Sequence, residues 1–62
     1  MNLTALEQVK IEIQKLESTN SSLYLYWQEL EEGHRFGKAD NTMVRIEANE
    51  KRIKLLKEAI DK

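Results

Sequence analysis

The chain has 62 residues with no cysteine, no proline and one histidine, and its charged residues, 34% of the total, balance to a net charge of −1. This length allows one domain at most, and the absence of cysteine excludes disulfides and thiolate metal sites. The balanced charge argues against binding to nucleic acid or membranes, and no apolar run approaches the roughly 20 residues of a membrane span. A domain this small is marginally stable alone, so we expect a homodimer to complete its core.

The sequence also indicates whether the protein is folded and where in the cell we expect it. Hydrophobic residues make up 40% of the chain and are regularly spaced, which predicts a folded rather than a disordered protein. The first residues lack the basic and apolar regions of a signal peptide, so we expect a cytoplasmic protein. Short, charged chains without cysteine or proline suit bacterial or phage accessory proteins, and we expect this chain to be one of them.

The first predicted element is a long helix over about residues 5–32. Thr4 and Glu7 have capping-box spacing, in which each side chain accepts a hydrogen bond from the backbone of the other residue. The apolar residues then step by three and four, as in a coiled-coil heptad. They are Leu6, Val9, Ile13, Leu16, Leu23, Trp27 and Leu30. Asn20 is the polar member of this seam, and segment 18–22 is a weak point where a break would give a three-helix chain.

A loop over about residues 33–40 and a helix over about 41–61 complete the hairpin. Gly33 is expected just past the first helix in a left-handed conformation, and three N-cap residues, Asp40, Asn41 and Thr42, follow. The second helix has an apolar seam and a second stripe on another face. The seam is Ile46, Asn49, Ile53, Leu56 and Ile60, and the second stripe is Val44, Ala48, Leu55 and Ala59. A hairpin buries one stripe per helix well, so the fold class is an all-α antiparallel two-helix hairpin that dimerises into a four-helix bundle.

Two alignments of the helices match their seams. In the tight alignment Asn20 meets Asn49, and the two amides can hydrogen-bond and fix the register. This alignment leaves a very short loop and places Glu17 near Glu50, which is unfavourable.

In the loose alignment, one heptad over, Leu30 meets Ile46, Glu17 approaches Lys57 and the loop uses the cap residues. The sequence favours this alignment because turn chemistry and charge agree. It leaves the start of the first helix without a partner in the chain. The candidate dimer interface is therefore Leu6, Val9 and Ile13 together with Val44 and Leu55.

Charge is divided between the two halves of the chain. Residues 1–33 hold six acidic and two basic side chains, and residues 34–62 hold eight basic and five acidic ones. This division favours pairing between unlike helices, although each exposed pair contributes only about 0–1 kcal/mol. The basic side chains also support an alternative function, contact with RNA or DNA. The candidates for it are Lys38, Arg45, Lys51 and Arg52.

The outline of this alternative, a short hairpin of two long helices that dimerises, resembles the Rop family of RNA-binding proteins that control plasmid copy number. The resemblance covers length and architecture. It carries no binding residue over, because no motif of the family is matched.

The aromatic segment 23–27 is apolar around the whole helix, so one face cannot bury it. One interpretation is a dimer core. The other is an anchor patch for a different protein, since Trp and Tyr dominate binding hot spots. The candidate partner-binding residues are Tyr24, Tyr26, Trp27 and Phe36.

The residue pattern indicates no reaction chemistry. His34 lacks a second histidine at ligand spacing, and carboxylate pairs such as Glu31 and Glu32 belong on solvated helix faces. We therefore expect a non-enzyme without cofactor or metal. Its expected role is a small interaction protein, an adaptor, regulator or inhibitor that docks a helical face on another protein. A structural subunit of a larger assembly is a further alternative.

Overall fold

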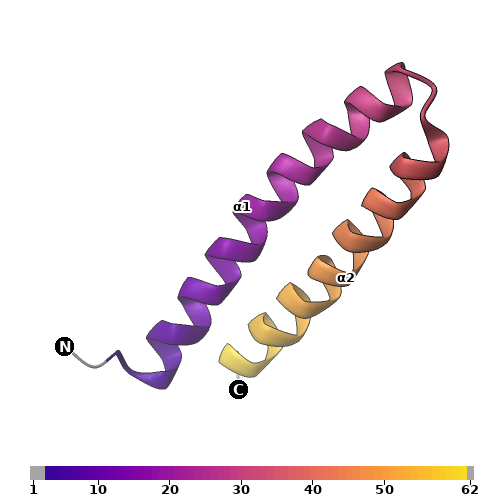
Figure 1. The fold of residues 1–62 in the computed structure, drawn as a ribbon. Helices are drawn as coiled ribbons and strands as arrows, with labels where there is room; N and C mark the ends of the chain where they lie inside the picture. Colours follow the sequence, from indigo (N-terminus) through magenta and orange to yellow (C-terminus); the bar gives the residue numbers. More distant parts are fainter. Residues whose placement is uncertain (1–2, 62) are drawn as a thin grey trace.

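The structure is a computed structural model that describes residues 3–61. It contains two helices, α1 (Ala5–Glu32) and α2 (Phe36–Ile60), which run antiparallel and lie side by side (Figure 1). The hairpin measures 45 × 24 × 12 Å, so it is one helix pair wide and one helix thick. Among the described residues there is no strand, and the predicted all-α hairpin is confirmed.

The start of α1 confirms the predicted capping box. The Thr4 hydroxyl accepts a hydrogen bond from the N–H of Glu7 at 3.1 Å, and the Glu7 carboxylate accepts from the N–H of Thr4 at 3.2 Å. The helix then continues unbroken through segment 18–22. Ser21 donates to the carbonyl of Glu17 at 3.1 Å, so its hydroxyl bonds within the helix and does not cap a new one.

The turn between the helices has a different left-handed residue from the one predicted. Gly33 has a φ of −86°, whereas His34 has a φ of 57°. Three consecutive N–H groups close the end of α1. Those of Gly33, His34 and Arg35 donate to the carbonyls of Glu29, Glu31 and Leu30 at 3.0, 3.1 and 2.8 Å. The chain therefore reverses within three residues, and the predicted loop over residues 33–40 is wrong.

The α2 helix begins at Phe36, about five residues before the predicted start. Asp40, Asn41 and Thr42 lie inside it, and the Thr42 hydroxyl donates to the carbonyl of Lys38 at 2.9 Å. Arg35 is the N-cap residue and makes no side-chain cap hydrogen bond. The early start brings Ala39 and Thr42 into the buried seam, and this burial outweighs the local preference of the cap residues for a helix start.

A pair of asparagines sets the register of the hairpin. The Asn49 amide donates to the Asn20 side-chain oxygen at 2.8 Å, and the Asn20 amide donates to the carbonyl of Ile46 at 3.2 Å. The structure thus has the tight alignment, and the favoured loose alignment is wrong. The loose alignment would place Asn20 opposite Leu56 and Asn49 opposite Trp27. It would bury two unpaired amides, each at about 1–3 kcal/mol.

The charge argument against the tight alignment fails because long side chains reach a neighbouring turn. Lys57 Nζ lies 3.8 Å from Glu17 Oε2, and Arg52 Nη2 lies 3.2 Å from Glu12 Oε1. All four side chains remain largely exposed, so each pair contributes little and follows from the register without determining it.

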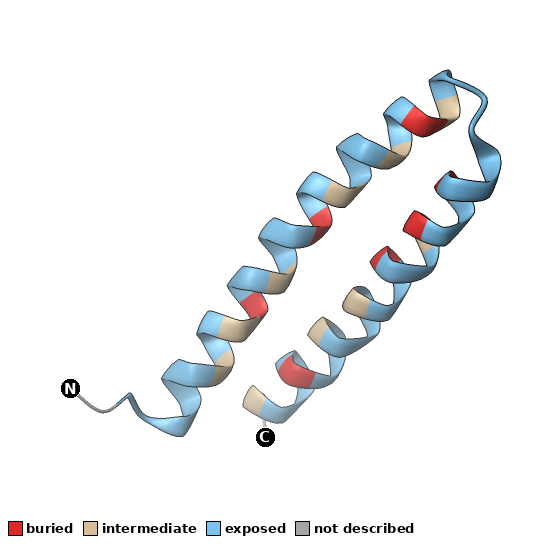
Figure 2. Cartoon of the chain, in the orientation of Figure 1, coloured by how far each residue is buried: buried red, intermediate tan, exposed pale blue. Residues whose placement is uncertain are grey.

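The buried residues lie on the facing sides of the two helices (Figure 2). The five apolar ones are Ile13, Leu30, Ala39, Ile46 and Leu56. Burial of Ile13 contradicts the expectation that this residue lacks a partner in the chain. Val9 is half-buried, and Leu6 remains exposed at the open end of the hairpin.

Candidate interaction surfaces

The structure does not gather the four candidate aromatic residues into one patch. Tyr24 and Tyr26 are both exposed, but residues two apart lie about 200° apart around a helix, so they occupy opposite edges of α1. Trp27 is half-buried in the seam. Phe36 is exposed at the turn, where its ring meets the His34 ring edge-on at 5.7 Å between centroids. A single aromatic anchor patch is therefore absent from residues 3–61.

Tyr24 is tied to the other helix by its hydroxyl, which donates to Glu50 Oε1 at 2.9 Å. This hydrogen bond raises the pKa of Tyr24 above its ordinary value, helped by desolvation and by the charges of Glu50 and Glu47. The side chain thus serves the contact between α1 and α2 along one edge of the hairpin.

An apolar stripe runs along the side of α2 that faces away from α1. Val44 and Leu55 are 64% and 61% exposed. They are eleven residues apart, about three turns, and so share a face about 16 Å long, with the exposed Ala48 between them. Ile46, two residues from Val44, points to the opposite side and is completely buried. We call Val44, Ala48 and Leu55 the outer stripe of α2.

The four candidate nucleic-acid contacts are exposed and lie on or beside this stripe. Lys38, Arg45 and Arg52 recur every seven residues, so they follow one margin of the stripe, whereas Lys51 lies one heptad after Val44, in line with it. The other margin carries the exposed carboxylates Glu47 and Glu58. Arg52 also pairs with Glu12 of α1. The candidates for nucleic-acid contact and the outer stripe of α2 thus form one surface, with a largely apolar centre, one basic margin and one acidic margin.

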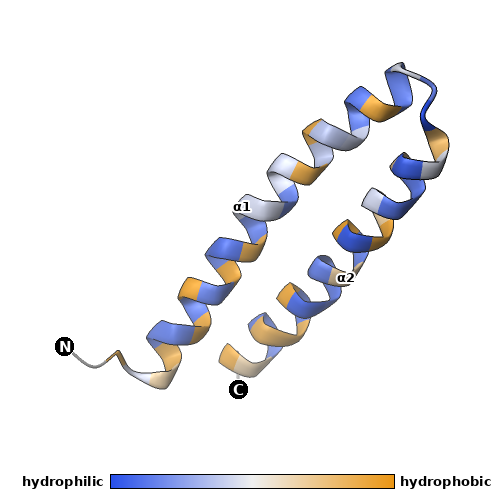
Figure 3. Cartoon of the chain, viewed as in Figure 1, coloured by the Kyte–Doolittle hydropathy of each residue, from blue (hydrophilic) through white to orange (hydrophobic). Residues whose placement is uncertain are grey.

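The middle of α1 differs from every other part of the hairpin in its lack of charge. Residues 18–28 contain no Asp, Glu, Lys or Arg, although such residues are 34% of the chain. Much of this part of α1 is pale in Figure 3, with a few hydrophobic and hydrophilic bands, whereas α2 alternates more strongly between the two extremes. On the side away from α2 it carries Ser18, Ser22 and Leu25, and Ile11 precedes them. We call these four residues the outer face of α1.

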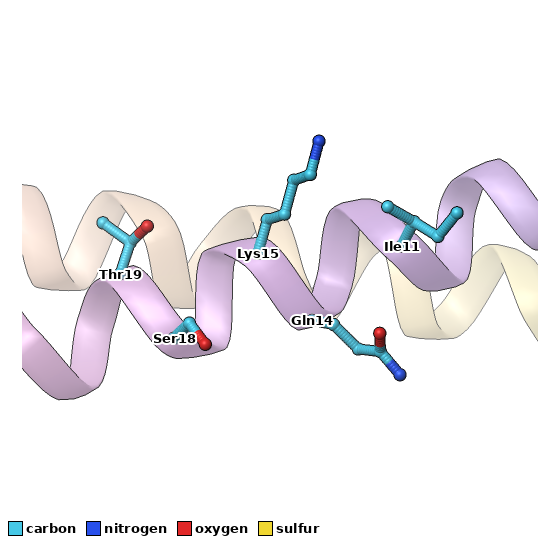
Figure 4. A pocket seen from close by; sticks show the side chains of 5 residues that line it. All are labelled: Ile11, Gln14, Lys15, Ser18 and Thr19. Atoms are coloured by element: carbon cyan, nitrogen blue, oxygen red, sulfur yellow. The ribbon is translucent and has the colours of Figure 1, made fainter.

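Two shallow hollows lie on the surface. One is lined by Ile11, Gln14, Lys15, Ser18 and Thr19, which all come from α1, and α2 lies behind the helix (Figure 4). The other is at the open end of the hairpin. It is lined by Ala5, Leu6, Val9, Ala59 and Ile60. Because residues from the end of α2 and the start of α1 line the second hollow together, these two segments lie side by side. Leu6 and Val9 therefore do not extend beyond the hairpin in the way that the loose alignment required.

The candidate dimer residues therefore have unequal environments. Ile13 is taken up by the intrachain core, and Val9 is partly covered. Leu6, Val44 and Leu55 are exposed, but Leu6 lies at the open end whereas the other two lie on α2. These five residues do not form one continuous face.

The turn offers no phosphate cradle, because the N–H groups of Gly33, His34 and Arg35 all donate to carbonyls of α1. Within residues 3–61, no group of three or more His, Asp or Glu side chains is arranged to hold a metal ion. Neither helix in this range is long and apolar enough to cross a membrane.

Comparison with known proteins gives no relatives for this chain. No protein-family model, no curated protein and no solved structure matches it.

Proposed function

We propose that this hairpin is a small protein-interaction module that docks the outer stripe of α2 on a partner protein. One observation carries the proposal: Val44 and Leu55 are 64% and 61% exposed on a helix whose seam is already occupied by α1. Aligned apolar side chains that the fold leaves in water favour a helical or grooved partner, because docking removes them from solvent.

The margins of the stripe define the chemistry of the partner. Arg45 and Arg52 follow one margin of the stripe, and Glu47 and Glu58, three residues after Val44 and Leu55, follow the other. Lys51 lies one heptad after Val44, within the stripe itself. A partner with an apolar centre, an acidic margin opposite Arg45 and a basic margin opposite Glu47 complements this pattern, and such complementarity determines the choice of partner and the association rate. The role of adaptor, regulator or inhibitor follows from occupation of such a surface on another protein.

A nucleic-acid target is the second candidate, supported by the margin of Lys38, Arg45 and Arg52. We rank it lower for two reasons. Arg52 already has a carboxylate partner in Glu12, and the apolar centre of the surface gains nothing from a phosphate backbone.

The proposal is tested by capture from an extract of the source cells with three baits. They are the wild type, the stripe variant Val44→Ser/Leu55→Ser, and a control Leu3→Ser/Leu6→Ser that removes two exposed apolar residues from the start of the chain. We expect the same protein to be captured by the wild type and the control and lost with the stripe variant, with helical circular dichroism unchanged. Equal capture by all three baits would rule out the outer stripe of α2 as the docking site.

Nucleic acid is tested separately by fluorescence anisotropy of a labelled RNA hairpin. Binding that falls steeply with salt, and that Arg45→Glu abolishes, would favour the nucleic-acid alternative. We expect no binding at low salt.

A further inference from the structure

We propose that two copies of the chain associate through the outer face of α1, packed antiparallel about a twofold axis. The centre of this face is the uncharged segment 18–28, so a partner there meets no charge that it must desolvate. The charged side chains that precede and follow this segment determine which partner fits, and they complement the same side chains of a second copy of the helix.

The charges of α1 are distributed unevenly along its outer side. Lys10 and Lys15 precede the uncharged segment, and Glu29 and Glu32 follow it. Within residues 3–61, the ion pairs between the helices use Glu12 and Glu17 of α1. Lys10, Lys15, Glu29 and Glu32 take part in neither of these pairs. Glu7 also lies on this side, but its carboxylate accepts hydrogen bonds from Thr4, and in the antiparallel pair it falls beyond the end of α1 of the second copy. Between residues 10 and 32 the outer side of α1 therefore has a basic first half and an acidic second half, and this polarity complements itself in an antiparallel pair.

The helical period places these charges on matching edges. Lys15 and Glu29 are fourteen residues apart, about four turns, and Lys10 and Glu32 are twenty-two apart, about six turns. Each lysine thus shares an edge with its glutamate, and the twofold axis of an antiparallel pair brings like edges together. With the axis between Ser21 and Ser22, Lys15 faces Glu29 of the second copy and Lys10 faces Glu32, each within one residue.

The side chains near the axis suit close packing. Ser18, Ser21 and Ser22 are small, so two helices can approach closely there. Leu25 of the second copy falls at the level of Ser18, at one end of the hollow in Figure 4. Four of the residues that line this hollow follow the spacing of the hole that accepts a knob from a facing helix. They are Ile11, Gln14, Lys15 and Ser18, and with this axis Gln28 and Glu29 of the second copy face the centre of the hole.

The outer stripe of α2 is a poorer surface for a second copy. The antiparallel alignment that packs Val44 on Leu55 of the second copy also brings Arg45 close to Arg52 of that copy, on the same edge. Opposite charges, Glu47 and Lys54, come equally close on the other edge. The two copies of Lys51, however, lie only about three residues apart near the twofold axis, and like charges oppose association.

The resulting assembly orders four helices as α2, α1, α1 and α2, and it leaves both outer stripes of α2 open. Self-association and partner docking thus use different helices, and the two proposals can fail independently.

Cysteine cross-linking tests the position of the axis, and the absence of natural cysteine makes the result specific. Ser22→Cys should oxidise to a disulfide-linked dimer, because the two copies of residue 22 lie beside the axis within the reach of a disulfide. Lys51→Cys, an exposed position on α2, is the matched control and should remain largely monomeric. Equal cross-linking of both variants, or none with Ser22→Cys, would overturn the proposal.

Charge reversal tests the selection of the partner by sedimentation equilibrium. Lys15→Glu and Glu29→Lys alone should each weaken the dimer about tenfold, since two contacts become repulsive. The double variant should recover the wild-type affinity, and a mixture of the two single variants should form a heterodimer. A wild type that is monomeric at high concentration, or a dimer that responds to Lys51→Glu and not to Lys15→Glu, would overturn the proposal.

Discussion

The two ends of the seam differ in how completely they are buried. On the turn side of the asparagine pair, all three seam residues of α2, Ala39, Thr42 and Ile46, are buried. On the open side Leu56 is buried, but Ile53 and Ile60 are only half-buried. On α2 the half of the seam near the turn is thus the more completely buried. The α1 seam shows no such gradient, since Leu23 and Trp27 near the turn are half-buried and Ile13 on the open side is buried.

This difference follows from the composition of the seam and from the turn. Small Ala39 and Thr42 lie near the short turn that links the helices, and both are buried. Bulkier isoleucines occupy the open half, and no covalent link restrains that end. The difference teaches that the apolar content of a seam does not by itself determine its burial, because the size of each side chain and its distance from the turn also matter.

The same substitution on either side of the asparagine pair sharpens this comparison. Ile46→Ala should lower the free energy of unfolding by about 2–5 kcal/mol, because it removes a completely buried side chain. Ile53→Ala, one heptad further along the same seam, should have a clearly smaller effect because Ile53 is half-buried. Urea unfolding followed by circular dichroism measures both.

If Ile46→Ala is unfolded in water, Ile46→Val and Ile53→Val provide the milder pair, at about 0.5–1.5 kcal/mol for the buried site. Equal losses at positions 46 and 53 would show that the two halves are equally firm and would contradict the comparison.

The asparagine pair at the boundary is the next site to change. Asn20→Leu leaves the Asn49 amide without its partner in a largely apolar layer, and we expect a loss of about 1–3 kcal/mol. The double variant Asn20→Leu/Asn49→Leu removes both amides and should recover most of that stability. It also removes the feature that excludes the loose alignment, so a second register should become populated.

Spin labels at Ser18 and Lys51, which lie at the same level of the two helices, detect the second register. A shift by one heptad moves the labels apart by about 10 Å along the axis. One unchanged distance in the double variant would show that the turn and the apolar seam hold the register without the asparagines.

The sequence predicts each helix better than it predicts their alignment. The capping box of Thr4 and Glu7, the extent of α1 and the seam residues around Asn20 and Asn49 follow from local spacing, and the structure confirms them. The predicted start of α2 was wrong because it relied on the cap preference of residues 40–42, which is a local property. Burial of Ala39, which favours the earlier start, depends on contact with the other helix.

The helix register and the interaction surfaces also depend on contacts between the helices, which local sequence patterns do not reveal. Exposed charge pairs favoured the loose alignment, but the hydrogen-bonded amides of buried Asn20 and half-buried Asn49 outweigh them, because an unpaired buried group is far more unfavourable than a missed exposed pair. The outer stripe of α2 was visible in the sequence, since its period predicts a second face. The aromatic residues Tyr24 and Tyr26 were expected to act together, and only their positions around α1 separate them.

The smallest predicted effect concerns Tyr24, which reaches across the boundary between the two halves to Glu50. The contact with Glu50 raises the Tyr24 pKa in the folded state above its value in the unfolded chain. The protonated hydroxyl therefore stabilises the fold fully below the ordinary tyrosine pKa. This contribution is lost as the pH rises through the raised pKa. Tyr24→Phe should remove this pH dependence.

The measurement compares thermal unfolding of the wild type and of Tyr24→Phe over alkaline pH, because other side chains titrate there in both proteins. The difference between their melting temperatures should shrink as the pH rises. Tyrosinate absorbance in a Tyr26→Phe background follows Tyr24 directly, and Glu50→Gln should bring its pKa closer to the ordinary value. A difference in melting temperature that does not change with pH would show that the ring of Tyr24, and not its hydroxyl, stabilises this edge of the hairpin.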